Sequence, residues 1–248
     1  MTLLESAKHF AISVGLYKIA RALHQILYRT ESEHARAHQS LLGHFVKAGD
    51  LAFDVGANIG IRTEILLSLG ATVVAFEPQP LCAREVAARR GNERLTVIGK
   101  AVGASEGTAQ FYLKVGNTYA SMMENWPGGN AGTTMVPVTT LDKAIQQFGI
   151  PAFCKIDVEG FEVEVLRGLS HQIPAMSFEY HCDEHGIERA RKCLDLVAAL
   201  GNYRVNLTGE EDAILLSDDW LTVPEFLESF PGCTKGNARG DMFVRAFG

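Results

Sequence analysis

From Leu51 onward the chain alternates short apolar runs with stretches of helical periodicity, and this alternation limits the fold more than any other feature. Apolar runs typical of buried strands occupy residues 51–55, 72–76, 95–98, 152–157 and 175–179. Helical patterns lie between them at residues 61–69, 80–90, 161–169 and 187–200. Such alternation builds a parallel sheet, because each return to the same edge needs a crossover helix. The sequence therefore predicts an α/β domain, and 47% hydrophobic residues can fill its core.

Both ends of the chain depart from this alternation. Near the C-terminus, NYRVNL, AILLS and DMFVRAF are strand-like runs without full-length helices between them, which predicts an antiparallel edge. Before residue 50, helical periodicity runs from Ser6 to Tyr28 and from Glu33 to Val46. Residues 1–49 are thus predicted to form a helical extension of a domain at 50–248. This extension can pack on the domain, form a homodimer contact or lie on a membrane surface, but charged residues interrupt it too often for a transmembrane helix.

The charge and the cysteines exclude several classes of protein. A formal net charge of −6 argues against nucleic acid as the main partner, since binding to phosphates requires a basic face. The five cysteines are scattered and never spaced as C-x-x-C, so neither a disulfide framework nor a zinc site is indicated. The N-terminal segment lacks the charge order and cleavage site of a signal peptide. We therefore expect a cytoplasmic protein with reduced thiols.

The first predicted strand ends in DVGANIG, a run that predicts a ligand site. Asp54 stands at the carboxyl end of the strand, Gly56 permits a turn that a β-carbon would obstruct, and Gly60 lets the next helix approach closely. The spacing lacks the middle glycine of G-x-G-x-x-G and the Gly-Lys-Ser/Thr of the P-loop. A carboxylate here repels a pyrophosphate but attracts an ammonium group. S-adenosyl-L-methionine (SAM) carries both an ammonium and a sulfonium.

The second predicted strand also ends in an acid. Glu77 follows Gly56 by 21 residues, a separation at which an acidic side chain can accept both hydroxyls of an adenosine ribose. Pro78 removes a backbone donor and ends the strand. Two strand-end acids with separate tasks favour SAM as the ligand. The missing glycine argues against a nicotinamide-dependent oxidoreductase.

Charged residues also alternate through FCKIDVEG in the middle of the chain. Lys155, Asp157 and Glu159 share one face of an extended strand. Charges in a central strand are costly unless they pair or face a polar cavity. The functional interpretation places Asp157 near the transferred methyl group and the acceptor oxygen, with Glu159 at the helix start nearby and Lys155 orienting the acids or a substrate hydroxyl. A buried ion pair of structural value is the alternative.

The next strand offers a second candidate base in MSFEYHCDEH. Glu179 and His181 alternate onto one face, and the near-neutral pKa of histidine suits removal of a proton from a hydroxyl. A structural histidine is the alternative. The acids and the histidine that follow, Asp183, Glu184 and His185, lack a firm ligand spacing, so no metal site is predicted.

Residues 114–134 interrupt the helix rhythm with a polar insert rich in glycine and asparagine. Loops of this length in a compact domain are usually functional lids or disordered. We expect a lid over the substrate, and four of its side chains are of types that stack on or hydrogen-bond a sugar ring: Tyr119, Ser121, Asn125 and Trp126. Packing of these side chains within the loop is equally compatible with the sequence.

Together these motifs resemble the FkbM family of SAM-dependent methyltransferases. The resemblance covers about residues 50–246, and KIDVEG is a quite specific part of it. It implies a class I methyltransferase fold, a Rossmann-like sheet of seven mostly parallel strands with one antiparallel strand, and methylation of hydroxyl oxygens, often on sugars. Carried over by position, the cofactor would be held by Asp54, Gly56, Ala57, Asn58, Gly60, Glu77, Pro78 and Asp157, with Lys100 and Ala101 beside the adenine.

The leading hypothesis is a SAM-dependent O-methyltransferase acting on a hydroxyl of a sugar-like or secondary-metabolite acceptor, a glycan or a small molecule. Asp157 or His181 is the candidate base. The alternative is a SAM-binding module without transfer activity that acts as a scaffold or regulator. The charged strand ends favour the enzyme, because a retired site has no reason to keep charges there. The sequence does not identify the acceptor.

Overall fold

The computed structural model describes residues 34–88, 93–114, 120–123, 130–209, 213–229 and 239–247. The helix predicted from Ser6 to Tyr28 lies outside them. Of the second predicted helix, residues 34–42 are helical, and the chain then passes through turns to Asp50 instead of staying helical to Val46. No helix in this described part has the length and apolar character needed to cross a membrane.

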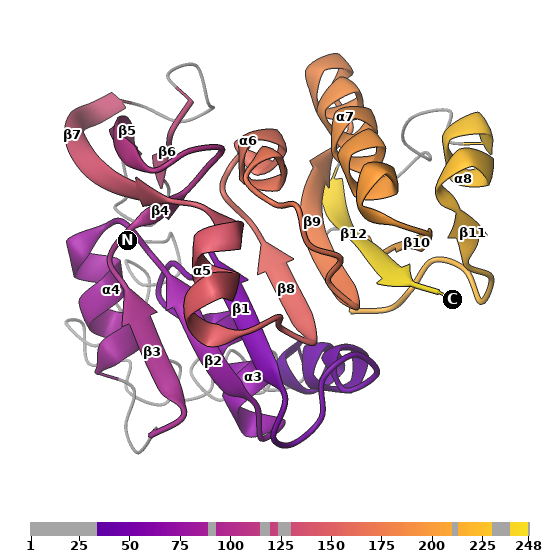
Figure 1. Cartoon of the computed structure of the whole chain (residues 1–248), viewed down its shortest axis with the longest axis horizontal. Helices are drawn as coiled ribbons and strands as arrows, with labels where there is room; N and C mark the ends of the chain where they lie inside the picture. The colour runs from indigo at the N-terminus through magenta and orange to yellow at the C-terminus, as the bar shows by residue number, and fades with distance from the viewer. Residues whose placement is uncertain are drawn as a thin grey trace, which may run out of the picture.

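A sheet of eight strands forms the centre of the described structure, in the order β11-β10-β12-β9-β8-β1-β2-β3 (Figure 1). The strands are β1 (Leu51–Val55), β2 (Thr72–Phe76), β3 (Leu95–Ile98), β8 (Phe153–Ile156), β9 (Ala175–His181), β10 (Tyr203–Leu207), β11 (Leu221–Thr222) and β12 (Arg239–Ala246). Neighbouring strands in the series β9-β8-β1-β2-β3 pair in parallel. Strand β12 lies between β9 and β10 and is antiparallel to both. The predicted α/β fold with an antiparallel C-terminal strand is confirmed, and the two-residue β11 adds an eighth strand.

One strand-like run near the C-terminus does not form a strand. AILLS, at residues 213–217, contributes a single β-bridge between Thr208 and Leu215. Ile214 and Leu216 are exposed. The strand that pairs with the outer side of β10 is β11 instead.

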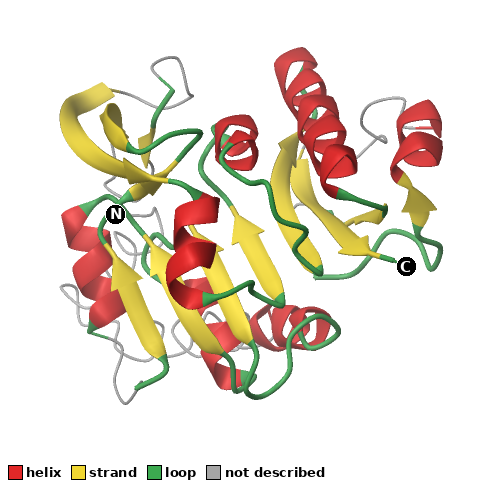
Figure 2. Ribbon diagram, in the orientation of Figure 1, coloured by secondary structure: helices red, strands yellow, loops and turns green. Residues whose placement is uncertain are grey.

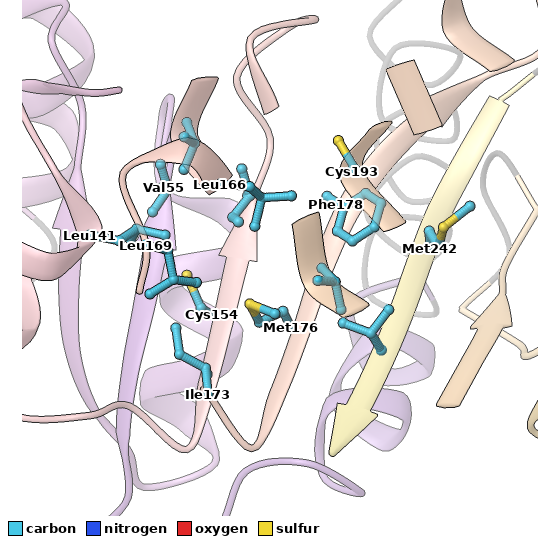
Figure 3. Packing of buried hydrophobic residues seen from close by; sticks show 14 of the residues in the cluster. Val55, Leu141, Cys154, Leu166, Leu169, Ile173, Met176, Phe178, Cys193 and Met242 are labelled. Atoms are coloured by element: carbon cyan, nitrogen blue, oxygen red, sulfur yellow. The ribbon is translucent and has the colours of Figure 1, made fainter. Parts of the chain in front are cut away.

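Helices cover both faces of the sheet (Figure 2). One face packs against α5 (Leu141–Phe148), α6 (Glu162–Arg167), α7 (Glu184–Leu200) and α8 (Val223–Ser229). Figure 3 shows part of this core, where Cys154, Met176 and Phe178 extend from β8 and β9. The other face packs against the helix at 34–42, α3 (Ile61–Ser68) and α4 (Pro80–Ala87). The side chains of a strand alternate between two apolar layers, so the apolar runs read as continuous.

The insert region contributes to a second, smaller sheet with the order β4-β7-β5-β6. Its strands are β4 (Ala101–Val102), β5 (Gly107–Lys114), β6 (Ala120–Ser121) and β7 (Asn130–Thr139). Figure 1 places this sheet at the arrowhead ends of β1–β3, which are the carboxyl ends of the parallel strands. Two parts of the insert, residues 115–119 and 124–129, lie outside the described residues. The insert therefore stands next to the edge where the ligand site is predicted.

The thiols differ in part from expectation. Cys82, Cys154 and Cys193 are free and buried, whereas Cys182 is disulfide-bonded. The prediction of reduced thiols is therefore wrong for Cys182. Its position directly after β9 is not a spacing motif, so the sequence carried no local signal for the bond.

Candidate active site

The turn after β1 folds back onto the end of β2. The backbone N–H groups of Gly56 and Ala57 both donate to the carbonyl oxygen of Phe76 at 3.0 Å. Asn58 and Gly60 follow in the left-handed backbone region, with φ of 51° and 84°. Asparagine and glycine tolerate that region better than other residues. The sequence DVGANIG thus builds a tight turn directly beside Glu77.

Gly56 also brings two turns of the sheet edge into contact. Its φ is +79°, and a β-carbon built on it would lie 1.8 Å from the carbonyl oxygen of Asp157. The N–H of Asp157 in turn donates to the carbonyl oxygen of Val55 at 2.9 Å. The β1–α3 turn and the β8–α6 turn therefore touch through backbone atoms, which only glycine at position 56 allows.

The Glu77 carboxylate is fixed by two backbone donors. The N–H of Asn58 donates to Oε2 at 2.7 Å, and the N–H of Gln79 donates to Oε1 at 2.8 Å. Burial raises the pKa of Glu77, and the two backbone hydrogen bonds limit the rise. Each carboxylate oxygen has two lone pairs, so each can accept a further hydrogen bond. Glu77 lines a cavity, which is where such donors would lie.

Asp54 is fully buried behind the turn. Its Oδ2 accepts the hydroxyl of Thr63 at 2.5 Å, and its Oδ1 has no hydrogen-bond partner among the described residues. Asp54 lies opposite Lys155 in the β1–β8 register. It lines neither of the two cavities described below. Asp54 therefore acts on the site electrostatically, because it helps to raise the pKa of both Lys155 and Glu77.

A first cavity opens between the strand ends and the small sheet. It encloses about 630 Å³, including its open mouth. Seven of the residues predicted to hold SAM line it, namely Gly56, Asn58, Glu77, Pro78, Lys100, Ala101 and Asp157. The predicted Glu159 is there too, and the small sheet adds Phe111 and Met122, which sequence reasoning missed. This lining fits an adenosine, because the Glu77 carboxylate can accept ribose hydroxyls and the apolar Phe111 and Met122 can pack against a flat ring system.

A second cavity lies on the other side of the same turn. Its wall includes His34 and His38 of the helix at 34–42, Arg62 of α3, and Lys155. Ala57, predicted to hold the cofactor, lines this cavity rather than the first, and Gly60 lines neither. Three residues, Gly56, Asn58 and Asp157, line both cavities. The two cavities therefore share a wall at the carboxyl ends of β1 and β8.

Asp157 is paired with Lys155 on that wall. The Lys155 Nζ lies 2.8 Å from Asp157 Oδ2, and 8% of the lysine side chain and 35% of the aspartate side chain are exposed. Burial works to raise the pKa of Asp157, but the Lys155 ammonium outweighs it and lowers the pKa. Burial likewise works to lower the pKa of Lys155, and the carboxylates of Asp157, Asp54 and Asp241 raise it. Both groups are charged, and Asp157 is the more accessible of the two.

The residues after Asp157 connect this wall to the small sheet. Glu159 adopts a left-handed φ of 53°, and its carbonyl oxygen accepts the hydroxyl of Ser121 at 2.8 Å. Ser121 is fully buried, so it holds the β8–α6 turn rather than presenting its hydroxyl to a sugar. The other insert residues singled out from the sequence, Tyr119, Asn125 and Trp126, lie outside the described residues.

Glu162 closes the same turn from the start of α6. Its Oε1 accepts the N–H groups of Val158 at 3.2 Å and Gly160 at 3.1 Å. Burial raises the pKa of Glu162 to about 7. Sequence reasoning missed this residue, because the N-cap position of α6 is Phe161, which is not one of the residue types that mark a helix start.

We expect Glu162 to make stability fall as pH rises from 4.5 to 7. The folded protein keeps the Glu162 proton up to a pKa of about 7, whereas the ordinary carboxyl pKa is 4.5. Unfolding thus releases a proton within this window, and the free energy of unfolding decreases by roughly 3 kcal/mol across it. Glu162→Gln does not titrate and keeps the accepting oxygen. Urea denaturation at pH 4.5 and 8 measures the free energy of unfolding of both proteins, and between these pH values we expect wild type to lose about this much more than the variant. If the difference between the two proteins is the same at both pH values, the assignment is wrong.

His181, whose charge helps to lower the pKa of Asp157, lines neither of the two cavities. Its Nε2 lies 3.0 Å from Glu179 Oε2, and this hydrogen-bonded partner raises the pKa of His181 against the effect of burial. The predicted pair on β9 therefore exists. Glu179 faces Asp241 of β12 in the register. Asp241 was missed, although an antiparallel strand begins at the edge where parallel strands end, so the first acid of DMFVRA could have been placed there.

No group of three or more His, Cys, Asp or Glu side chains in the described part of the chain is arranged to hold a metal ion. The acids on the β8, β9 and β12 ends act on one another electrostatically: Asp157 and Glu179 add to the rise that burial causes in the pKa of Asp241. This edge of the sheet is consequently rich in carboxylates but contains two cations, Lys155 and Arg62, that also act on Asp241.

Comparison with known proteins decides the family. Residues 54–204 match the sequence model of the methyltransferase FkbM domain, which covers more than half of the 248 residues. The chain belongs to the FkbM family. It therefore has the class I methyltransferase Rossmann-like fold, and SAM is its cofactor. The first cavity fits this cofactor, because the buried Glu77 carboxylate is preorganised by two N–H groups and retains acceptor capacity toward the cavity.

Individual relatives are distant. The hexuronic acid methyltransferase AglP of Haloferax volcanii is 27% identical over 131 residues, a match that spans 52% of this chain and about half (54%) of the relative's length. A precorrin-6y C5,15-methyltransferase of Geobacter metallireducens has a TM-score of 0.45, with 9% identity and coverage of 86% and 87% of the two chains. A TehB-like SAM-dependent methyltransferase of Corynebacterium glutamicum has a TM-score of 0.44, with 10% identity and coverage of 85% and 88%.

Proposed function

We propose that the protein transfers the methyl group of SAM to a hydroxyl oxygen of a sugar-type acceptor. The position of Asp157 carries the proposal, because this carboxylate lines both the cavity with Glu77 and the neighbouring cavity with Arg62. A base on the shared wall can reach an acceptor in one cavity that faces a methyl donor in the other. The match to a hexuronic acid methyltransferase, at 27% identity over about half of each protein, supports a sugar acceptor.

In the proposed mechanism the residues around the two cavities have separate tasks. SAM supplies a methyl group already activated by its sulfonium. Glu77 would accept the ribose hydroxyls, Phe111 and Met122 would cover the adenine, and the wall at Gly56 would set the distance between methyl donor and acceptor. Alignment of this kind accounts for a large part of the barrier reduction in displacement reactions. The remaining task is to take the proton of the acceptor hydroxyl.

Asp157 suits that proton transfer better than His181. A hydroxyl oxygen becomes far more acidic as it gains a methyl group, so even a carboxylate whose pKa is lowered can accept the proton during transfer. His181 lines neither cavity, and its pKa is raised by Glu179, which favours the protonated ring. We therefore assign the base to Asp157. Lys155 orients it, which gives the ion pair both a structural and a functional role.

The cofactor part of the proposal is tested by binding of S-adenosyl-L-homocysteine (SAH) to Glu77→Gln. An amide at this position presents an N–H₂ group to one of the two backbone donors and loses one acceptor for the ribose. We expect the dissociation constant from isothermal titration to rise between about 10-fold and 100-fold, as for loss of a charge-assisted hydrogen bond. Glu85→Gln removes an exposed carboxylate from α4 and is the matched control. Equal affinity in wild type and Glu77→Gln would refute the ribose assignment.

The acceptor part is tested by transfer of radiolabelled methyl from SAM to hexuronic acids and neutral hexoses. A labelled product that resists mild base treatment is an ether, as expected for O-methylation of a hydroxyl, whereas a methyl ester would be hydrolysed. SAH binding without transfer to any acceptor tried would favour the alternative of a non-catalytic SAM-binding module.

A further inference from the structure

We propose that the second cavity is a carboxylate-binding site whose principal residue is Arg62. The inference rests on the proposed function, because it takes the wall at Asp157 as the place where methyl donor and acceptor meet. It goes further in assigning a ligand chemistry to a cavity for which the family match assigns none. Arg62 is the second residue of α3, immediately after the turn that separates the two cavities.

The guanidinium of Arg62 is available for a ligand. It is half-buried in the cavity wall and makes no hydrogen bond or ion pair with any residue in the described portion of the chain. A partly buried arginine usually pairs with a carboxylate, because its charge is otherwise poorly compensated. The planar guanidinium fits a carboxylate with two parallel N–H···O bonds. An incoming carboxylate would satisfy it.

The other basic residues of the cavity do not compete with Arg62 for this task. Lys155 is already paired with Asp157 at 2.8 Å. Burial lowers the pKa of His38 to about 3, helped by Arg62, His34 and Lys155, so this ring is neutral and can donate a hydrogen bond without adding charge. His34 is exposed at the rim. Among the described residues that line this cavity, Arg62 therefore carries the positive charge without a carboxylate partner.

The acids near Arg62 do not prevent an anion from binding. Asp157 is neutralised by Lys155, and Asp241, which also feels Arg62, has its pKa raised by burial. Glu64 lies on the same cavity wall but already has an interaction partner. A carboxylate that enters beside Arg62 and His38 thus meets one unpaired positive charge and one neutral hydrogen-bond donor.

Two molecules at this wall can supply the carboxylate. One is the methionyl end of SAM, whose sulfonium must lie at the wall if the adenosine occupies the first cavity. The other is the acceptor, if it is a hexuronic acid. The chemistry recognised is the same in both cases, and the position of Arg62 beside the shared wall is compatible with each.

Paired ligands that differ only in a carboxylate test the site. The cofactor arm compares SAM with decarboxylated SAM, which keeps the ammonium and the sulfonium. The acceptor arm compares methyl β-D-glucuronide with methyl β-D-glucoside, bound to the SAH-loaded protein and followed by NMR titration. The variants are Arg62→Gln, Arg62→Lys and the exposed control Arg84→Gln on α4. Thermal melting of each variant checks that it is folded.

In one of the two arms we expect Arg62→Gln to weaken the carboxylate-bearing ligand by about tenfold or more and to leave its partner ligand unchanged. Arg62→Lys should restore only part of the affinity, because an ammonium cannot form both bonds. An effect in the cofactor arm identifies the methionyl carboxylate, and an effect in the acceptor arm identifies a uronic acid. Unchanged affinities in both arms would overturn the site. Failure of the wild type to bind SAM at all would instead contradict the proposed function.

Discussion

Gly56→Ala should destabilise the protein and abolish measurable SAH binding. The new β-carbon would lie 1.8 Å from the carbonyl oxygen of Asp157, so the two turns at the sheet edge must separate. The left-handed φ of +79° adds about 1–2 kcal/mol, and forced repacking adds about 1–3 kcal/mol. We expect the free energy of unfolding from urea titration to fall by roughly 3 kcal/mol. SAH binding is lost as well, because Gly56 forms part of the cavity wall.

Gly49→Ala is the matched control for this prediction. Gly49 has a similar φ of +91°, but a β-carbon there meets nothing within 4 Å. The control therefore carries the backbone cost without the contact, and the difference between the two variants measures how tightly the turns are packed. If both variants lose the same stability and both bind SAH, the contact between the turns has no energetic role.

Asp157→Asn should slow methyl transfer by about 10²–10⁴-fold, the usual contribution of a positioned general base. The side chain keeps its shape but can no longer take up the acceptor proton. A single-turnover measurement at saturating SAM and acceptor isolates the transfer step from binding. Stability will also fall, because Lys155 then has a buried charge without its 2.8 Å partner, a loss that the partial exposure of Asp157 moderates. The assay must therefore be run well below the melting temperature of the variant.

His181→Ala is the comparison for this second prediction. His181 lines neither cavity, so we expect a transfer rate close to that of wild type. A rate that collapses in His181→Ala but survives in Asp157→Asn would reverse the assignment of the base. Lys155→Gln is a third variant to measure. It keeps Asp157 but removes the ammonium that lowers the pKa of this carboxylate, so the pH dependence of the transfer rate should shift.

The acids at the strand ends could be predicted from the sequence, because each stands directly at the end of an apolar run. Asp54 and Glu77 follow apolar runs with a β-period, and parallel strands bring their carboxyl ends to one edge of the sheet. The alternation of Lys155 and Asp157 was enough to put both on one face. These local patterns predicted the α/β sheet and placed Gly56, Glu77 and Asp157 at the first cavity, whereas Asn58, Lys100 and Ala101 were predicted from the family resemblance.

Residues that reach the site from separate elements could not be predicted in this way. Arg62 and His38 meet at the second cavity because two helices cover the same face of the sheet, and neither helix carries a signal of which residues will face the other. For Ser121 the sequence left a sugar contact and packing within the loop equally open, because its burial depends on the pairing of β5 with β6. Asp54 was predicted to meet the ligand, but a fully buried side chain below the turn faces Lys155 instead.

The bond between Ser121 and the carbonyl oxygen of Glu159 has a practical consequence for protein engineering. It joins the covering sheet to the backbone two residues after Asp157, the proposed base, so we expect displacement of this sheet to move the turn that carries Asp157. Libraries that aim to change the acceptor should therefore hold Ser121 constant as part of the framework. Variation placed around His34 and Arg62 would alter the neighbouring cavity without touching this bond.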